Sequence, residues 1–511
     1  MKPIERMLSG TLTRRDGLKL AGLALGGLSL PGVVGRTAGA ATDVCTQYPE
    51  CGGFDWANQA YSWWDQDVTT QDYTHGYPPL ESNEMRITFL GSTIPPARIA
   101  QALMSVFIEV GGGPNGTALD QVAFDLGTGS TTNYNAMGIT PGRLDKLFIN
   151  HLHFDHMGDL INLYCSGPVG DRKNPQFVFG QSHSGVWSPR PDRRRYPDGT
   201  IAFCKALREV CRWNSESFSF LPTSYEDGVF TFPVKEKWGL PYEPEQVGDD
   251  PPTDGYALYP VELPWWKTDV AYNNPSTQLK VTHFPVVHDR QGAMGYKVEW
   301  NGLRVVYTSD TKPEVNTIVQ GSHGGKGVDV LIHEMVVPPD VWTMMAMRLS
   351  SADWNNENFV HAVKTNATIE HSSHTPPGAF GYLLSQVSPR PRLTVATHFP
   401  VSDQLIACAL QCVQRHCPDI GTDVRELMQY GLIWSMDRMV IRLFAGDPKP
   451  AIQVWKPTVL EYSLPAFPQY KSLNFKTPKY HDRQGNPDPL AQLDLSTVIW
   501  PGPDTYCASG Y

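Results

Sequence analysis

The stretch His151-Leu152-His153-Phe154-Asp155-His156 decides how this sequence is interpreted. It follows the apolar run from Lys146 to Asn150, so three histidines and one aspartate leave the end of a predicted strand and enter a loop. Neutral imidazoles suit Zn²⁺, and the two alternating histidines can reach one ion while Asp155 and His156 reach a second ion beside it. The spacing therefore predicts a metal site with two ions.

The sequence on either side of this motif alternates short apolar runs with turn residues, which predicts β-strands. Before the motif the predicted strands span 85–90, 104–110, 121–126 and 146–150. After it they span 279–284, 294–300, 304–309, 328–333 and 393–398, and helices are predicted at 157–164 and around 377–386. This mixture predicts the α/β class.

These segments resemble the metallo-β-lactamase superfamily, whose signature is HxHxDH, and most closely its ribonuclease Z and arylsulfatase-like branch. Before the motif the likeness is carried by Ile87-Thr88-Phe89-Leu90-Gly91-Ser92, by Phe124-Asp125-Leu126-Gly127-Thr128-Gly129 and by the run from Asp145 to Asn150. After it the likeness is carried by Tyr307-Thr308-Ser309-Asp310-Thr311, where the branch has Gly-Asp-Thr, by His333-Glu334 and by Thr397-His398. The resemblance covers roughly 85–165 and 280–400, and it implies an αββα sandwich.

The resemblance also implies a ligand set for two Zn²⁺ ions per chain. The first ion would be held by His151, His153 and His288, the second by Asp155, His156 and His398, with Asp310 bridging. His283 competes with His288, which is favoured because Gly295-Tyr296 follows it as in the branch. Two adjacent ions lower the pKa of a shared water, and the resulting bridging hydroxide can attack an ester-like centre.

A further histidine is expected to act on the leaving group. His374-Thr375-Pro376 resembles the His-Ser-Thr motif of the branch, whose histidine donates a proton to the leaving group. His371 is a second candidate, but the separation from His398 and the intervening helix favour His374. Glu334 is its expected carboxylate partner, so the candidate catalytic residues are His374, Glu334 and the ligand Asp155. Asp125 is interpreted as an acceptor for a ligand histidine.

The first forty residues have the features of an export signal. Arg14-Arg15 precedes an apolar run from Leu20 to Val34 and the small residues Ala38-Gly39-Ala40, which resembles a bacterial twin-arginine signal peptide. The apolar run is shorter than the ~20 residues that span a bilayer, so stable membrane insertion is not expected. The sequence therefore predicts recognition by the twin-arginine translocation machinery and a periplasmic or secreted protein.

The remaining chain is divided by composition. A signal peptide (1–40) and an aromatic-rich leader (41–84) precede a catalytic domain (85–445), which contains an irregular insertion at about 167–276, and a Pro- and Tyr-rich tail (446–511) follows. The nine cysteines are an odd number without CxxC spacing, which argues against a cysteine zinc site. Cys45 with Cys51 and Cys204 with Cys211 are plausible local pairs, while Cys408 and Cys412 lie one helical turn apart.

The composition and charge narrow the function classes. With 42 Lys+Arg against 52 Asp+Glu, the net charge of −10 argues against binding a nucleic-acid polymer and favours a small-molecule substrate. The favoured function is an exported binuclear zinc hydrolase acting on a phosphodiester or sulfate ester. A lactone or amide hydrolase, an iron-dependent oxidoreductase and a metal-dependent binding protein stay open as alternatives, as does a homo-oligomer.

Overall fold

The computed structural model describes residues 78–98, 100–113, 116–187, 195–218, 246–248, 254–289, 291–347, 349, 353–401, 403–420, 431–446 and 451–455. The predicted export signal, most of the leader, and the tail from 456 onward lie outside these residues. Within them, no helix is both long enough and apolar enough to cross a bilayer.

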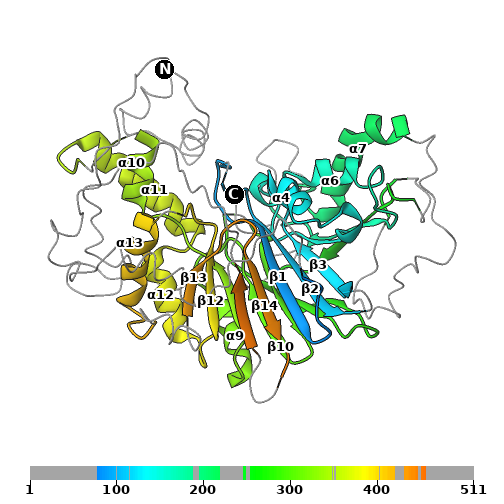
Figure 1. Ribbon diagram of the computed structural model, residues 1–511. Helices are drawn as coiled ribbons and strands as arrows, with labels where there is room; N and C mark the ends of the chain where they lie inside the picture. The colour runs from blue at the N-terminus through cyan, green and yellow to red at the C-terminus, as the bar shows by residue number, and fades with distance from the viewer. Residues whose placement is uncertain are drawn as a thin grey trace, which may run out of the picture.

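Two mixed β-sheets form the centre of the fold (Figure 1). The first sheet has the order β15-β14-β1-β2-β3-β4-β5-β6, with bounds Ala451–Trp455, Val440–Phe444, Glu84–Gly91, Ser105–Gly112, Ala118–Phe124, Lys146–Phe148, Gln176–Gln181 and Leu258–Leu263. The second has the order β13-β12-β11-β10-β9-β8-β7, with bounds Gly431–Trp434, Leu393–Thr397, Val330–Glu334, Leu303–Tyr307, Met294–Trp300, Lys280–Pro285 and Asp269–Asn273.

Helices cover the outer face of each sheet (Figure 1). The first sheet is covered by α4 (Ser130–Ala136), α6 (Leu160–Ser166) and α7 (Thr200–Phe218). The second is covered by α9 (Val315–Ser322), α10 (Pro339–Met347), α11 (Glu357–Ser373), α12 (Pro377–Gln386) and α13 (Asp403–Gln414). The short helix α5 (Phe154–Met157) and two 3₁₀ turns, Pro141–Arg143 and His323–Gly325, complete the elements. This four-layer arrangement confirms the predicted αββα sandwich of the metallo-β-lactamase fold.

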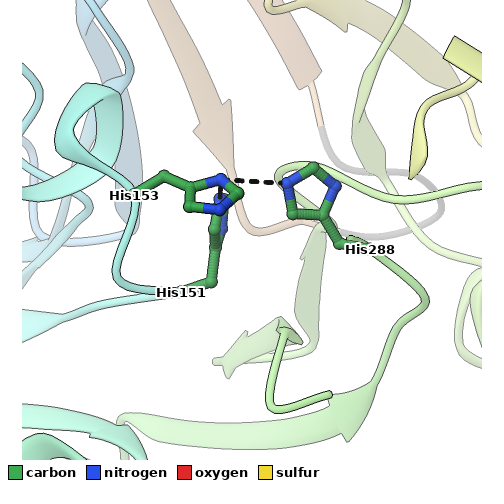
Figure 2. A group of neighbouring side chains, drawn as sticks. All are labelled: His151, His153 and His288. Carbon is green, nitrogen blue, oxygen red and sulfur yellow. Dashed lines mark hydrogen bonds between the residues drawn. The ribbon is translucent and has the colours of Figure 1, made fainter. Parts of the chain in front are cut away.

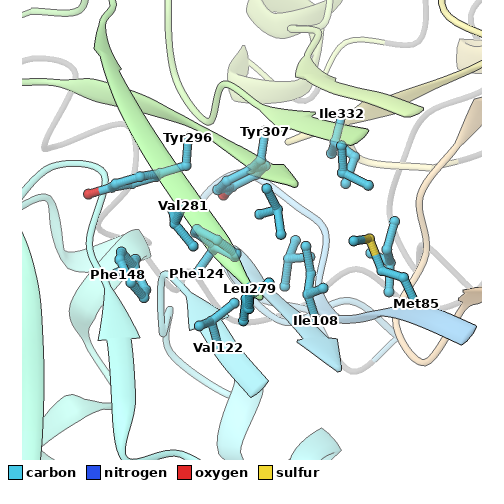
Figure 3. Packing of buried hydrophobic residues seen from close by; sticks show 14 of the residues in the cluster. Met85, Ile108, Val122, Phe124, Phe148, Leu279, Val281, Tyr296, Tyr307 and Ile332 are labelled. Atoms are coloured by element: carbon cyan, nitrogen blue, oxygen red, sulfur yellow. The ribbon is translucent and has the colours of Figure 1, made fainter. Parts of the chain in front are cut away.

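The core lies between the two sheets, where aromatic and branched side chains from both meet (Figure 3). Strand β2 shows why the sequence pattern is so apolar. Its Val106, Ile108 and Val110 face this core, whereas Phe107 faces the helices on the other side. Strands that are buried on both faces read as nearly continuous hydrophobic runs, and this made them recognisable in the sequence.

Strand direction brings the predicted ligands to one edge. Strands β3 and β4 run parallel in the first sheet, and β10, β11 and β12 run parallel in the second. The loops after β3, β4, β10 and β12 carry Asp125, the segment 151–156, Asp310 and His398, and these loops pack closely. A Cβ on Gly127, in the loop after β3, would lie 2.1 Å from the carbonyl oxygen of Asp155, so only glycine allows this approach.

The structure corrects two predicted boundaries. The insertion predicted at 167–276 is not irregular throughout, because its described residues include β5, β6 and β7, which extend both sheets, and helix α7. The folded body also continues past residue 445, since β15 pairs with β14 at the edge of the first sheet. The prolines and charge runs of this region obscure its secondary-structure pattern in the sequence, and the strands become evident only from their pairing with neighbouring strands.

The predicted pairing of Cys204 with Cys211 is wrong. Both lie on α7, seven positions apart and therefore about 10.5 Å apart along the helix axis, whereas a disulfide requires Cα atoms within roughly 7 Å. Both remain buried thiols. The Cys211 thiol instead forms a hydrogen bond with Cys165 of α6, and burial together with this contact raises the pKa of Cys211 to about 12. Cys45 and Cys51 lie outside the described residues, as does the side chain of Cys408.

Candidate metal centre

Three histidines from two loops form a first ligand group. His151 and His153 follow β4, and His288 follows β8 on the other sheet (Figure 2). Nδ1 of His153 lies 2.9 Å from Nε2 of His151 and 3.1 Å from Nε2 of His288. The three nitrogens therefore converge on one point, as ligands of a single ion would.

Two carboxylates and two histidines form a second ligand group, and all four side chains are buried. His156 Nε2 lies 3.4 Å from Asp155 Oδ2 and 3.3 Å from Asp310 Oδ2. His398, after β12, brings its Nε2 to 3.3 Å from Asp155 Oδ2 and 3.5 Å from Asp310 Oδ2.

Asp310 lies between the two groups. Its Oδ2 contacts both histidines of the second group and is 3.8 Å from His288 Nε2 of the first. One carboxylate oxygen within reach of both groups is the position that a bridging ligand requires. The structure thus brings together all seven residues of the predicted ligand set.

The state of these side chains fits metal binding. Burial and the neighbouring His156, His288 and His153 hold the pKa of His151 well below its usual range, and burial lowers the pKa of His288 to about 4. Both are neutral and keep lone pairs for a metal. His156 Nε2 and Asp310 Oδ1 are buried without a hydrogen bond to any described residue, and a cation would satisfy both.

The second group is charged instead. Burial opposes protonation of His156, but Asp310, Asp155 and Asp125 outweigh it and raise the pKa of His156 well above its usual range. Burial likewise opposes charge on His398, whose pKa is raised to about 9 by Asp310, Asp155 and Glu334. In the metal-free protein, these protons balance the carboxylates that a cation would otherwise neutralise.

Hydrogen bonds orient the ligand imidazoles. Asp125 accepts from His156 Nδ1 at 3.0 Å, as the sequence predicts, so the Nε2 of His156 faces the second group. Two similar partners were not predicted from the sequence. His151 Nδ1 lies 2.7 Å from Asn150 Oδ1, and His288 Nδ1 donates to the Ser373 carbonyl at 2.9 Å. Asn150 could have been predicted from the sequence because it directly precedes His151. Ser373 could not, because only the fold brings it next to His288.

The structure places His374 and Glu334 together beside the ligands. His374 Nδ1 is 2.9 Å from Glu334 Oε2 and 4.0 Å from Asp310 Oδ2. Burial opposes charge on the imidazole, but the Glu334 carboxylate raises the pKa of His374 to about 10. Glu334 is itself held by the backbone amide of Thr311, and the His374 ring stacks on His398. A protonated imidazole therefore stands at the edge of the second group.

The competing histidines have different positions. His283 lies in β8 and is fully buried away from both ligand groups, with burial lowering its pKa to about 3. It therefore does not replace His288. His371 lies in the last turn of α11, and its side chain is outside the described residues.

Comparison with known proteins links the chain to ribonucleases. No protein-family model matches it. Ribonuclease Z of Pyrococcus furiosus is 24% identical over 220 residues, covering 42% of this chain and 64% of that protein. Ribonuclease BN of an Enterobacter species is 30% identical over 118 residues, covering 21% of this chain and 38% of that protein. The chain thus matches less than two thirds of the length of these relatives.

Among solved structures, the metallo-β-lactamase fold protein YhfI from Bacillus subtilis is similar at a TM-score of 0.39 and 12% identity. The match covers 70% of this chain and 99% of that one. The layers of sheets and helices described above are those of the metallo-β-lactamase fold, and the sequence of the chain is similar to the ribonuclease Z and ribonuclease BN enzymes.

The raised pKa values of the second group predict that metal binding releases protons. At about pH 7, binding of the second ion should release about two protons, from His156 and His398, because a metal needs neutral imidazoles. The affinity of this group should rise with pH, and the rise should become less steep above about pH 9, where the pKa of His398 is passed and only His156 still has to lose a proton. Titration calorimetry in buffers of different ionisation enthalpy measures the release.

The first group provides the internal control, since its histidines are already neutral. A His398→Ala variant keeps that group and should bind its ion with little proton release. The prediction would be contradicted if the two ligand groups released equal numbers of protons on binding zinc, or if the zinc affinity of the second group did not change with pH.

Proposed function

We propose that the protein is a metal-dependent hydrolase that uses two Zn²⁺ ions to cleave a phosphodiester bond. The observation that carries the proposal is the position of Asp310 Oδ2, within 3.8 Å of ligand nitrogens from both groups and 4.0 Å from His374 Nδ1. Two ions and a proton donor would then share one reaction space. No serine or cysteine nucleophile is required.

Two adjacent cations supply water activation and stabilisation of the negative charge that develops on the substrate. The histidines and carboxylates of the two groups would hold these cations, and their mixture of nitrogen and oxygen donors suits zinc. The chain's own loops determine the spacing of the two groups, because every ligand is anchored close to the end of a buried strand.

His374 is proposed to protonate the leaving group. Glu334 binds its Nδ1, which leaves Nε2 available for a substrate atom. The side chain of His374 is 20% exposed while that of Glu334 is fully buried, so of the two only the imidazole is accessible from the site. Glu334 acts through His374 by keeping it oriented and charged.

The relatives favour a phosphodiester over the alternatives. Both are named ribonucleases, so the exclusion of nucleic acid expected from the net charge of −10 is not retained, and RNA stands beside small phosphodiesters as a substrate class. Sulfate esters, lactones and amides remain comparison substrates, since proteins of one fold differ in the bond they cleave. Iron-dependent redox chemistry is the alternative that metal analysis separates.

We further propose that the protein is exported to the periplasm by the twin-arginine machinery. The proposal rests on Arg14-Arg15, on the apolar run that follows and on the small residues Ala38-Gly39-Ala40. Because this route transports folded proteins, the metal centre would be loaded before export.

Metal content and phosphodiesterase activity test the first proposal together. The purified protein should contain about two zinc ions per chain, and removal by a chelator should abolish hydrolysis of bis(nitrophenyl) phosphate until zinc is restored. His151→Ala should lose one ion and nearly all activity, whereas His361→Ala, on the exposed face of α11, should change neither. At most one ion after reconstitution would rule out the binuclear centre.

The role of His374 is tested by the choice of leaving group. His374→Ala should keep both metals but reduce kcat on the order of 10²–10⁴-fold for an alkyl phosphodiester, whose leaving group needs a proton. The loss should be much smaller for a nitrophenolate leaving group. His371→Ala should have little effect on either substrate. Equal losses on both substrates, or loss of a metal, would assign His374 to binding instead.

Export is tested by fractionation. Replacing Arg14 and Arg15 together by Lys should retain the folded, metal-loaded protein in the cytoplasm, while Arg36→Lys, outside the pair, should leave delivery to the periplasm unchanged. Unaltered delivery of the double variant would disprove the proposal.

A further inference from the structure

Ser309 stands immediately before the shared ligand Asp310, and its backbone conformation is unfavourable. Its φ of 53° lies in the left-handed region, which is unfavourable for a residue with a Cβ. Glycine adopts this conformation without the penalty. The serine in this chain therefore needs a compensating interaction.

The compensating interaction is made by the serine hydroxyl. Ser309 is buried, and its Oγ donates to Asp125 Oδ2 at 2.9 Å. The same Oγ lies 3.2 Å from His156 Nδ1, the atom that Asp125 also binds. Ser309 therefore contacts both members of the pair that orients a ligand of the second metal.

A second hydroxyl, from strand β10, also donates to Asp125 Oδ2. The hydroxyl of Tyr307, two residues earlier, donates to Asp125 Oδ2 at 2.7 Å, and the backbone N–H of Asn150 donates to Oδ1 at 2.8 Å. Asp125 is fully buried, and its own φ of 55° is also left-handed. The carboxylate thus accepts from four donors, namely Tyr307, Ser309, the backbone of Asn150 and His156, and together they fix its orientation. In this orientation it accepts the Nδ1 hydrogen of His156, so that Nε2 of His156 points toward the second ligand group.

We propose that Ser309 is a positioning residue for the second metal: its hydroxyl, together with that of Tyr307, holds Asp125 so that His156 presents Nε2 to the ion. This inference rests on the proposed metal centre and adds a residue that acts through Asp125 and His156. The chain retains an unfavourable backbone conformation at Ser309 because the hydroxyl improves metal binding.

Metal titration of Ser309→Gly tests the proposal without any substrate. Glycine relieves the backbone but removes the hydroxyl, so the metal-free variant should unfold at about the same denaturant concentration as the wild type. Its affinity for the second zinc should fall on the order of 10–100-fold, with the first unchanged, as measured against a chromophoric chelator. Ser309→Ala should show the same loss of affinity and also a lower unfolding midpoint.

Two further variants separate positioning from general stability. Tyr307→Phe removes the other hydroxyl and should also weaken the second ion. Asn301→Gly relieves another left-handed residue, with a φ of 47° in the exposed turn between β9 and β10, and should leave both metal affinities unchanged. If Ser309→Gly and Ser309→Ala both bind the second zinc like the wild type, the proposal is wrong. A wild-type protein that binds two ions but hydrolyses no phosphodiester would overturn the proposed function and not this inference.

Discussion

The buried carboxylate of Asp125 is the constraint on which the site depends. It directly follows β3 of the first sheet, yet two of its donors come from the second sheet, Tyr307 in β10 and Ser309 in the loop that follows it. A buried carboxylate without partners is strongly unfavourable, so these hydrogen bonds require the edges of the two sheets to stay in register. The fourth donor is His156, and through it the same requirement sets the geometry of the second ligand group.

The two ligand groups differ in charge, and this difference organises the chemistry. The first group consists of neutral imidazoles, whereas the second pairs carboxylates with protonated imidazoles. Asp310 and the His374–Glu334 pair lie on the charged side. A cation that enters the second group therefore replaces protons, while one that enters the first group fills a set of free lone pairs. Proton transfer and metal binding are thus concentrated in a single buried cluster.

The two halves of the chain contribute unequally to this cluster. The first half supplies one continuous motif, from His151 to His156, on the loop and short helix after β4. The second half supplies single residues from separate strand ends, namely His288, Asp310 and His398. Because the strands that carry these residues end at one edge, residues more than a hundred positions apart in sequence become neighbours. A loop that changes length near one strand end would therefore alter the site without altering the fold.

The sequence alone indicates the α/β class and a metal site, because strands buried on both faces produce continuous apolar runs and the spacing of the HxHxDH motif suits metal ligands. The other three ligands, His288, Asp310 and His398, stand singly in the sequence, and only the resemblance to a known superfamily implied them. The sequence did not identify β5, β6 and β7, which turn residues and charge runs conceal and only strand pairing reveals. Three contacts can be found only in the folded structure: that of Cys165 with Cys211, that of Ser373 with His288, and that of Ser309 with Asp125. Each contact joins segments that are distant in sequence, and a local sequence pattern does not indicate which buried donor will lie opposite which acceptor.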